Sequence, residues 1–228
     1  MKLNRISERI WVYPYEEERD RPNLTYIKGD RWSLAVDAGH SEAHVREFYG
    51  ALEAAGLPLP ELTVITHWHW DHTFGMHAVH GLTLANEQTN RYLLDFKARL
   101  EQEGTGFFLA MHESIRREYT GGKPVVVVPA DLVFRREMTL DAGNCPVRIF
   151  RTEAPHTDDS TLIWLPEERF LILGDCTGGT FPDGIMDQAL ADRLTAAIQE
   201  LSPETCLTGH WTPLSQEIIV NDLLNGEG

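Results

Sequence analysis

The sequence contains few cysteines, little positive charge and no long apolar run. Its three cysteines, Cys145, Cys176 and Cys206, lie far apart and form no CxxC pair. They therefore indicate neither a cysteine zinc site nor a disulfide framework. No apolar run is long enough to span a bilayer, and Met1 to Arg9 lack the apolar segment of a signal peptide. We expect a cytoplasmic protein with no membrane partner.

The charge balance and the length set further limits. Lys and Arg number 20 against 35 Asp and Glu, which gives a net charge of -15. Because binding to a phosphate backbone needs a basic surface, we expect no nucleic-acid partner. The 228 residues, 42% of them hydrophobic, are enough for one large core and few for two catalytic domains. We predict a single domain over residues 1–228; nothing in the sequence sets its oligomeric state.

Apolar periodicity predicts strands and helices in two successive halves of the chain. Strands are expected over 9–14, 23–28, 33–36, 62–65, 82–85, 125–128, 138–140, 147–150, 160–165, 170–173 and 206–208. Helices are expected over 41–55, 87–103, 112–119, 187–201 and 215–224, with a further helix starting at 73–78. Strands come first in each half, which predicts an α+β fold: two packed sheets with helices outside, in a four-layer αββα sandwich.

The densest cluster of metal-binding side chains is the segment THWHWDH, from Thr66 to His72. It follows the buried strand expected over 62–65. In extended backbone His67 and His69, two residues apart, point to the same side. Asp71 and His72 follow as the chain turns, and can face a second point nearby. Imidazole and carboxylate donors suit zinc, iron or manganese. A histidine-rich surface loop is the alternative interpretation.

Three further donors each follow an apolar strand directly: His156, Asp175 and His210. Gly174 and Gly209 precede the last two and let the backbone turn tightly. A single aspartate at a strand end is more often a turn former. Together with the THWHWDH segment, however, the set offers five histidines and two aspartates. That number of donors matches two metal ions sharing one cleft.

The segment HWHWDH is an instance of H-x-H-x-D-H, and the later His156, Asp175 and His210 follow in the order of the metallo-β-lactamase superfamily. The chain resembles that family from about residue 9 to residue 211. The resemblance implies an αββα sandwich with a site at one edge and two divalent ions, zinc first, with manganese or iron as alternatives. It implies one metal held by His67, His69 and His156, and a second by Asp71, His72 and His210. Asp175 would bridge them, and Asp37 resembles the family's aspartate behind the ligands.

Two metal ions can hold a hydroxide between them at neutral pH, and Asp71 can orient it or accept its proton. We therefore expect Asp71 to be catalytic in a metal-dependent hydrolase of a small-molecule ester, thioester, lactone or amide. A metal-dependent phosphodiesterase and an iron-containing oxidoreductase of the sulfur dioxygenase type are the alternatives. Cys176 is a poor candidate nucleophile because no dedicated base accompanies it.

The chain departs from the zinc β-lactamases of the B1 type next to Asp175. Those enzymes have a cysteine ligand at this position, whereas Cys176 falls one residue later, and no Lys follows in Thr177 to Phe181. We therefore expect β-lactams to be poor substrates. Phe107, Phe108 and Met111, in the stretch 104–119, are candidates for a pocket wall or for ordinary core.

Overall fold

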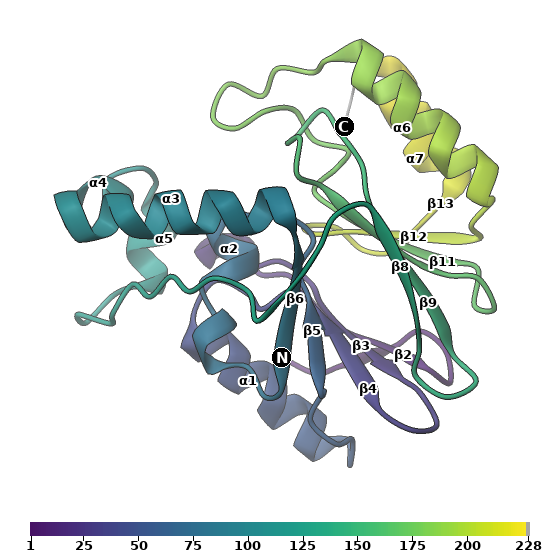
Figure 1. Cartoon of the computed structure of the whole chain (residues 1–228), viewed down its shortest axis with the longest axis horizontal. Helices are drawn as coiled ribbons and strands as arrows, with labels where there is room; N and C mark the ends of the chain where they lie inside the picture. The colour runs from purple at the N-terminus through teal and green to yellow at the C-terminus, as the bar shows by residue number, and fades with distance from the viewer. Residues whose placement is uncertain (227–228) are drawn as a thin grey trace.

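The computed structural model describes residues 1–226 and contains two β-sheets that face each other (Figure 1). The first sheet has the order β1 (Asn4–Arg5), β2 (Ile10–Tyr13), β3 (Leu24–Lys28), β4 (Ser33–Val36), β5 (Leu62–Val64), β6 (Leu82–Asn86) and β7 (Leu132–Phe134). Strands β1 to β4 pair antiparallel, and β4 to β7 pair parallel.

The second sheet has the order β13 (Leu214–Ser215), β12 (Thr205–Thr208), β11 (Phe170–Gly174), β10 (Thr161–Leu165), β9 (Pro146–Arg151) and β8 (Glu137–Asp141). Its strands pair antiparallel except β11 and β12, which pair parallel.

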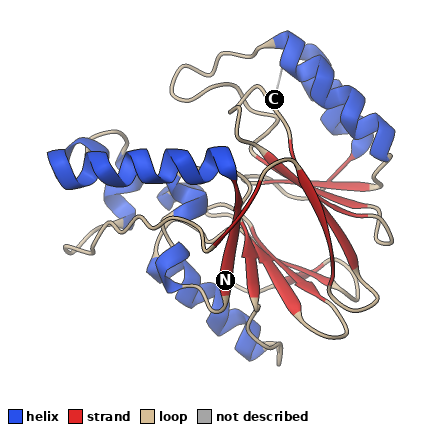
Figure 2. Ribbon diagram, in the orientation of Figure 1, coloured by secondary structure: helices blue, strands red, loops and turns tan. Residues whose placement is uncertain are grey.

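Helices cover the outer face of each sheet (Figure 2). They are α1 (Glu42–Ala54), α2 (Trp70–Thr73), α3 (Glu87–Glu103), α4 (Gly106–Leu109), α5 (Glu113–Glu118), α6 (Gln188–Leu201) and α7 (Gln216–Asn225), with 3-10 turns at Glu17–Arg19 and Met76–Ala78. The four long helices begin at side-chain caps, Ser41, Asn86, Asp187 and Ser215. The side-chain oxygens of these residues accept hydrogen bonds from free backbone N–H groups of the first turn. The predicted four-layer arrangement is confirmed.

Burial of both faces of the central strands, such as β4, β5, β10 and β11, explains their nearly continuous apolar runs. In β10, Ile163 points into the core between the sheets, while Leu162 and Trp164 point toward α6 and α7. In β2, Ile10 and Val12 likewise enter the inter-sheet core. Alternate residues therefore serve two different cores, and a strand without polar positions is the result.

Two predicted elements are wrong. The run 125–128 has no regular secondary structure, and Val125, Val127 and Val128 pack on an aromatic cluster under α3. The helix expected at 73–78 instead begins at Trp70, and a 3-10 turn follows at Met76–Ala78. Strands β1, β7 and β13 were not predicted, since two or three residues carry no periodic signal.

The sheets bring several strand ends to the same edge of the molecule. Asp37 follows β4, Thr66 follows β5, and the backbone N–H of Thr161 in β10 donates to the carbonyl of Thr66 at 2.7 Å. This hydrogen bond joins the two sheets directly beside the histidine-rich segment. Among residues 1–226, no helix combines the length and the apolar character needed to cross a bilayer.

Candidate metal centre

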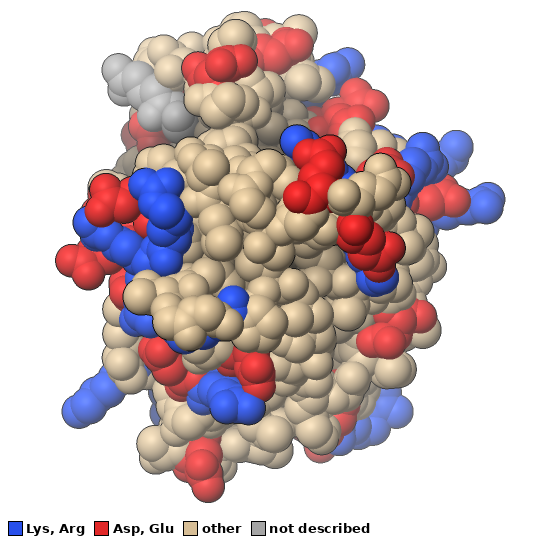
Figure 3. Space-filling view, turned by 90° about the vertical axis from the view of Figure 1, so that its left-hand side faces the viewer, with Lys and Arg blue, Asp and Glu red and all other residues tan. Residues whose placement is uncertain are grey.

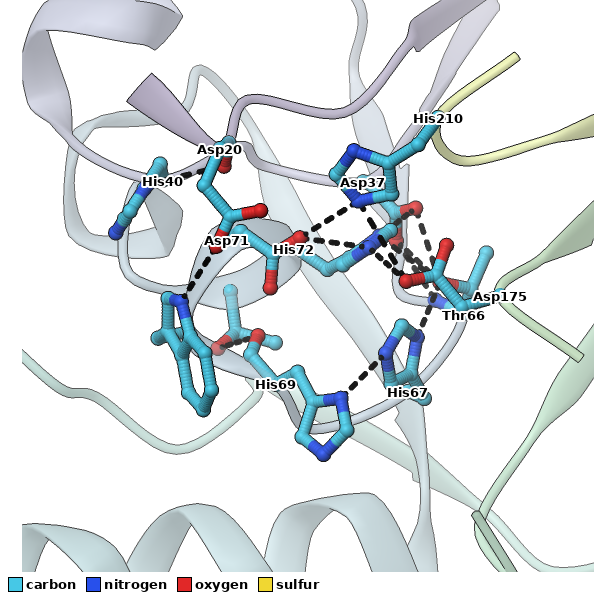
Figure 4. Close-up of polar contacts among 12 residues, drawn as sticks. Asp20, Asp37, His40, Thr66, His67, His69, Asp71, His72, Asp175 and His210 are labelled. Carbon is cyan, nitrogen blue, oxygen red and sulfur yellow. Dashed lines mark hydrogen bonds and ion pairs between the residues drawn. The ribbon is translucent and has the colours of Figure 1, made fainter. Parts of the chain in front are cut away.

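The seven predicted ligands come from several loops and from α2, and they meet at this edge. Figure 4 shows six of them: His67, His69, Asp71, His72, Asp175 and His210. They form two groups, a three-histidine group of His67, His69 and His156 and a carboxylate group of Asp71, His72, Asp175 and His210. Within each group the ligand atoms lie within 4.8 Å of one another. Asp71 and His72 lie in α2 rather than in an open turn, so a rigid helical turn presents both side chains.

In the three-histidine group the ring nitrogens converge. Nδ1 of His69 lies 3.1 Å from Nε2 of His67 and 2.9 Å from Nε2 of His156. On the outer side, Nδ1 of His156 donates to the carbonyl of Gly179 at 2.8 Å, and Nδ1 of His67 contacts Oγ1 of Thr66 at 3.1 Å. A proton held on the outer nitrogen leaves a lone pair on the inner one.

Burial determines the charge of this group. It lowers the pKa of His69 to about 3 and that of His67 well below the usual value, and neighbouring histidines act in the same direction. Both rings are therefore neutral at physiological pH, and their inner lone pairs are available to a cation.

The carboxylate group is held together by charge. Nε2 of His210 lies 3.0 Å from Oδ2 of Asp71 and 3.5 Å from Oδ2 of Asp175. Burial alone would raise the pKa values of Asp71 and Asp175, but His72 and His210 hold both well below the usual value. Burial alone would lower the pKa of His210, but Asp175 and Asp71 raise it to about 10. Protons on histidine thus balance the carboxylates when no metal is bound.

Asp175 is in contact with both groups. Its Oδ2 atom lies 3.3 Å from Nε2 of His72 and 3.8 Å from Nε2 of His156. The backbone around it is crowded, because a Cβ on Gly209 would lie 2.1 Å from Oδ1 of Asp175. Gly174 has φ +55, and a Cβ there would lie 2.8 Å from Thr66. Glycine at these positions lets the two loops approach closely.

Asp37 fixes the orientation of His72. Its Oδ2 accepts a hydrogen bond from Nδ1 of His72 at 2.7 Å, and its Oδ1 accepts from the backbone N–H of Thr66 at 2.8 Å. The bond turns Nε2 of His72 toward the carboxylate group. There Nε2 is buried and makes no hydrogen bond among the described residues, although Oδ2 of Asp71 lies 3.1 Å away. A buried imidazole nitrogen that faces two carboxylates without an aligned hydrogen bond to either fits a metal ion.

Sequence reasoning missed Asn23 and Asp159, which brace the loops that carry ligands. The side-chain amide of Asn23 donates to the carbonyls of Thr208 and Trp211, at 2.9 and 2.7 Å, on either side of His210. Oδ2 of Asp159 accepts from the backbone N–H of Trp68 at 2.9 Å. Both residues look like ordinary turn formers in sequence, because their partners are distant along the chain.

Two cavities meet at the metal centre and share His156, Asp175 and His210. The first, which we call the aromatic cavity, has a volume of about 310 Å³ and is also lined by Asp20, Trp70, His112 and Phe181. The second, which we call the α7 cavity, has a volume of about 580 Å³ and is lined by Trp211, Leu214, Ile218 and Ile219 among others. Apolar walls with a few convergent polar groups are typical of ligand sites.

The candidate wall residues of the stretch 104–119 line neither cavity. Phe108 is fully buried in the core and Phe107 packs under the guanidinium of Arg99, 3.9 Å from it. Only His112 from that stretch reaches the aromatic cavity. Cys176 is buried outside both cavities, and burial raises the pKa of its thiol to about 12, which agrees with the expectation that it is no nucleophile.

Comparisons with known proteins agree with this architecture. The sequence profile described as "Metallo-beta-lactamase superfamily" matches residues 19–210. A search of curated proteins found no match. A metallo-β-lactamase from Pontibacter korlensis superposes with a TM-score of 0.69 at 16% identity, covering 100% of this chain and 99% of that one. One from Hirschia baltica gives 0.68 at 17%, covering 99% and 96%.

The sec-alkylsulfatase Pisa1 from Pseudomonas sp. also superposes, with a TM-score of 0.71 at 16% identity. The superposition covers 99% of this chain and 40% of that one. At identities this low, the structural similarities establish the fold alone.

Proposed function

Since the chain belongs to the metallo-β-lactamase superfamily, we propose that it is a dinuclear metal-dependent hydrolase of a small ester, thioester, lactone or amide. The observation that carries the proposal is the meeting of two donor groups at Asp175, at the point where two cavities join. A pair of donor groups in contact is the arrangement that two-metal hydrolases require.

The donors suit two divalent ions, with zinc as the first choice and manganese or iron as alternatives. His67, His69 and His156 would hold one ion, and Asp71, His72 and His210 the other, with Asp175 between them. When bound, such ions acidify a water molecule and supply positive charge for the oxyanion that develops during acyl transfer. No serine or cysteine nucleophile is needed.

In this proposal Asp71 handles the proton of the attacking water. Its Oδ2 atom contacts His72 and His210, whereas Oδ1 makes no hydrogen bond among residues 1–226. Asp71 also lines the aromatic cavity. A carboxylate with one anchored oxygen and one free oxygen at a cavity wall can orient a water and accept its proton.

The lining of the cavities bears on the substrate. No Lys or Arg lines either cavity, and no Lys follows Asp175 as far as Phe181. A β-lactam or phosphodiester, both anionic, would find no counter-charge from the protein beside the metal centre. On the face shown in Figure 3, acidic and basic side chains lie close together rather than in one continuous basic area. These features favour acyl transfer to water on a substrate that carries no negative charge.

The experiment begins with metal content. Protein purified with added zinc or manganese should contain close to two ions per chain by elemental analysis, one for each donor group. A content of one ion at most, after supplementation, would contradict the dinuclear proposal. The loaded protein is then assayed against lactone, thioester, β-lactam and phosphodiester panels, with a redox assay for the iron alternative. Efficient turnover of a penicillin or a phosphodiester would overturn the substrate class.

A further inference from the structure

Asp20 lines the aromatic cavity but belongs to neither metal-binding group. It ends the 3-10 turn Glu17–Arg19 in a left-handed conformation, with φ 52. In Figure 4 its carboxylate points toward the space occupied by Asp71. One oxygen, Oδ2, accepts a hydrogen bond from Nε1 of Trp70 at 3.2 Å. The structure thus adds a carboxylate to the wall of the cavity that the metal ligands open into.

Hydrogen bonds from His40 hold the backbone of Asp20 in place. Nδ1 of the fully buried His40 donates to the carbonyls of Arg19 and Asp20, at 2.8 and 3.0 Å. The hydroxyl of Tyr119 in turn donates to the carbonyl of His40 at 2.6 Å. A chain of buried hydrogen bonds therefore supports the left-handed residue, and such a conformation persists only where the surroundings hold it.

Asp20 forms no ion pair among residues 1–226, and His210 in the same cavity wall pairs with Asp71 and Asp175 instead. The flanking arginines point elsewhere: Arg19 pairs with Glu16 at 2.6 Å, and Arg21 pairs with the buried Glu118 at 2.8 Å. No Lys or Arg lines either cavity. The chain thus places a carboxylate in the wall of a partly closed cavity. The neighbouring arginines pair with other acids. A ligand can supply the missing positive charge.

The walls beside Asp20 suit an organic cation. The rings of Trp70 and Phe181 lie 4.9 Å apart at 76° and both line the cavity. Phe181 remains 44% exposed, although it is a large apolar side chain. Aromatic faces attract ammonium groups, most strongly where water is excluded. A cavity wall that combines a carboxylate with two aromatic rings suits a substituted ammonium and is unfavourable for an anion.

We propose that the aromatic cavity binds the cationic end of the substrate, with Asp20 as counter-charge and Trp70 and Phe181 as walls. The cleaved bond lies at the metal centre, and the α7 cavity takes the apolar part on the other side. This inference rests on the proposed function, because it assumes that the two cavities hold the two ends of a hydrolysed substrate. Asp20 is then a specificity-determining residue.

The test uses metal-loaded protein and sets of para-nitrophenyl esters. Within a set the acyl chains have the same length, and sets of several lengths are compared. The chains end in trimethylammonium, in tert-butyl, which has the same shape without charge, or in carboxylate. For wild-type protein we expect kcat/KM for the cationic ester to exceed that for its neutral isostere by about tenfold. The carboxylate ester should be the poorest substrate.

Asp20→Asn should reduce the ratio between cationic and neutral ester to about one, with metal content at the wild-type level. Asp183→Asn is the matched control: it removes the same charge from an exposed loop residue outside both cavities, and should keep the ratio. An unchanged ratio in Asp20→Asn, or equal wild-type rates on the two esters, would overturn the assignment.

Binding without turnover separates the two proposals. Aryl ketones with a methylene in place of the ester oxygen cannot be hydrolysed and are titrated by calorimetry. A cationic preference that Asp20→Asn abolishes, together with no hydrolysis of any ester, would support the cation site and contradict the proposed function. Hydrolysis of the esters, together with equal binding of cationic and neutral ketones, would support the proposed function and contradict the cation site.

Discussion

The two metal groups differ in how they are charged before any ion binds. In the three-histidine group, burial keeps the pKa values of His67 and His69 far below their usual range, so these two rings are neutral. The carboxylate group instead carries charges of both signs, with Asp71 and Asp175 ionised and His210 protonated. An ion can therefore meet His67 and His69 without displacing a proton, whereas an ion entering the carboxylate group must displace the proton of His210.

This difference assigns separate tasks to the two groups. The three-histidine group can hold an ion at the inner lone pairs of neutral His67 and His69. The charged group responds to protons, to loss of a carboxylate and to reorientation of a histidine. We therefore expect substitutions in the carboxylate group to change activity and the second ion, while the ion of the three-histidine group is retained.

Asp71→Asn tests this separation with the largest expected effect. The amide keeps the shape of the side chain but can neither accept a proton nor neutralise an ion, so kcat should fall by about a hundredfold or more. The fold and the ion of the three-histidine group should remain. Turnover and metal content are measured together, with Asp158→Asn, an exposed aspartate near His156, as control. Near-wild-type turnover would remove Asp71 from the mechanism.

Asp175→Ala removes the residue that contacts both groups. We expect the metal content to drop toward one ion per chain, because the carboxylate group loses a ligand while the three histidines remain. Activity should fall with that loss. Asp175→Cys should shift the preference toward zinc and away from manganese, since thiolate is the softer ligand. Competition between metals checks both variants, and Asp175→Ala with two ions at unchanged affinity would show that Asp175 bridges nothing.

Asp37→Asn acts on the carboxylate group through the hydrogen bond between Asp37 and His72. An amide nitrogen facing Nδ1 of His72 would favour the tautomer with the proton on Nε2, where a metal should bind. We expect the affinity for the second ion to fall by about ten- to a hundredfold, with the first ion little changed. Metal titration of the wild type and the variant measures both steps. An equal loss of affinity for both ions would indicate that Asp37 has a general structural role.

The smallest effect concerns pH and the metal-free protein. The pKa of His210 is raised to about 10 from 6.5, so its pairing with Asp175 and Asp71 stabilises the fold fully below pH 6.5. That contribution is lost as the pH rises toward 10. Urea unfolding should therefore show stability declining over this range, less steeply in His210→Gln. A decline of the same slope in the variant would assign the pH dependence to other groups.

Most strands, and the grouping of the seven donors at one edge, could be predicted from the sequence for a physical reason. Strands buried on both faces, such as β11, are continuous apolar runs, and a donor directly after one must lie at a sheet edge. The start of α2 could not be read, because His69 at its N-cap makes no side-chain capping bond. The run 125–128 was misread since apolar burial against helices produces the same composition as a strand.

The cavities lay beyond sequence reasoning because they depend on contacts between distant segments. Asp20 stands in a charged stretch, Glu16 to Arg21, that is typical of a solvated surface. Only the fold shows that Arg19 and Arg21 pair with other acids while Asp20 turns inward. Phe181 and His112 likewise carry no local pattern that would indicate a cavity wall.

The bonds from Asn23 to the loop around His210 connect residues 185 and 188 positions apart. Contacts of such sequence separation form late, because a long loop must close first. During synthesis the three-histidine group has all its members once residue 156 has emerged, whereas the other group waits for His210 and for β12. The donors of the two candidate groups therefore become available in two stages during synthesis, and Asp71 can meet His210 only after residue 210 has left the ribosome.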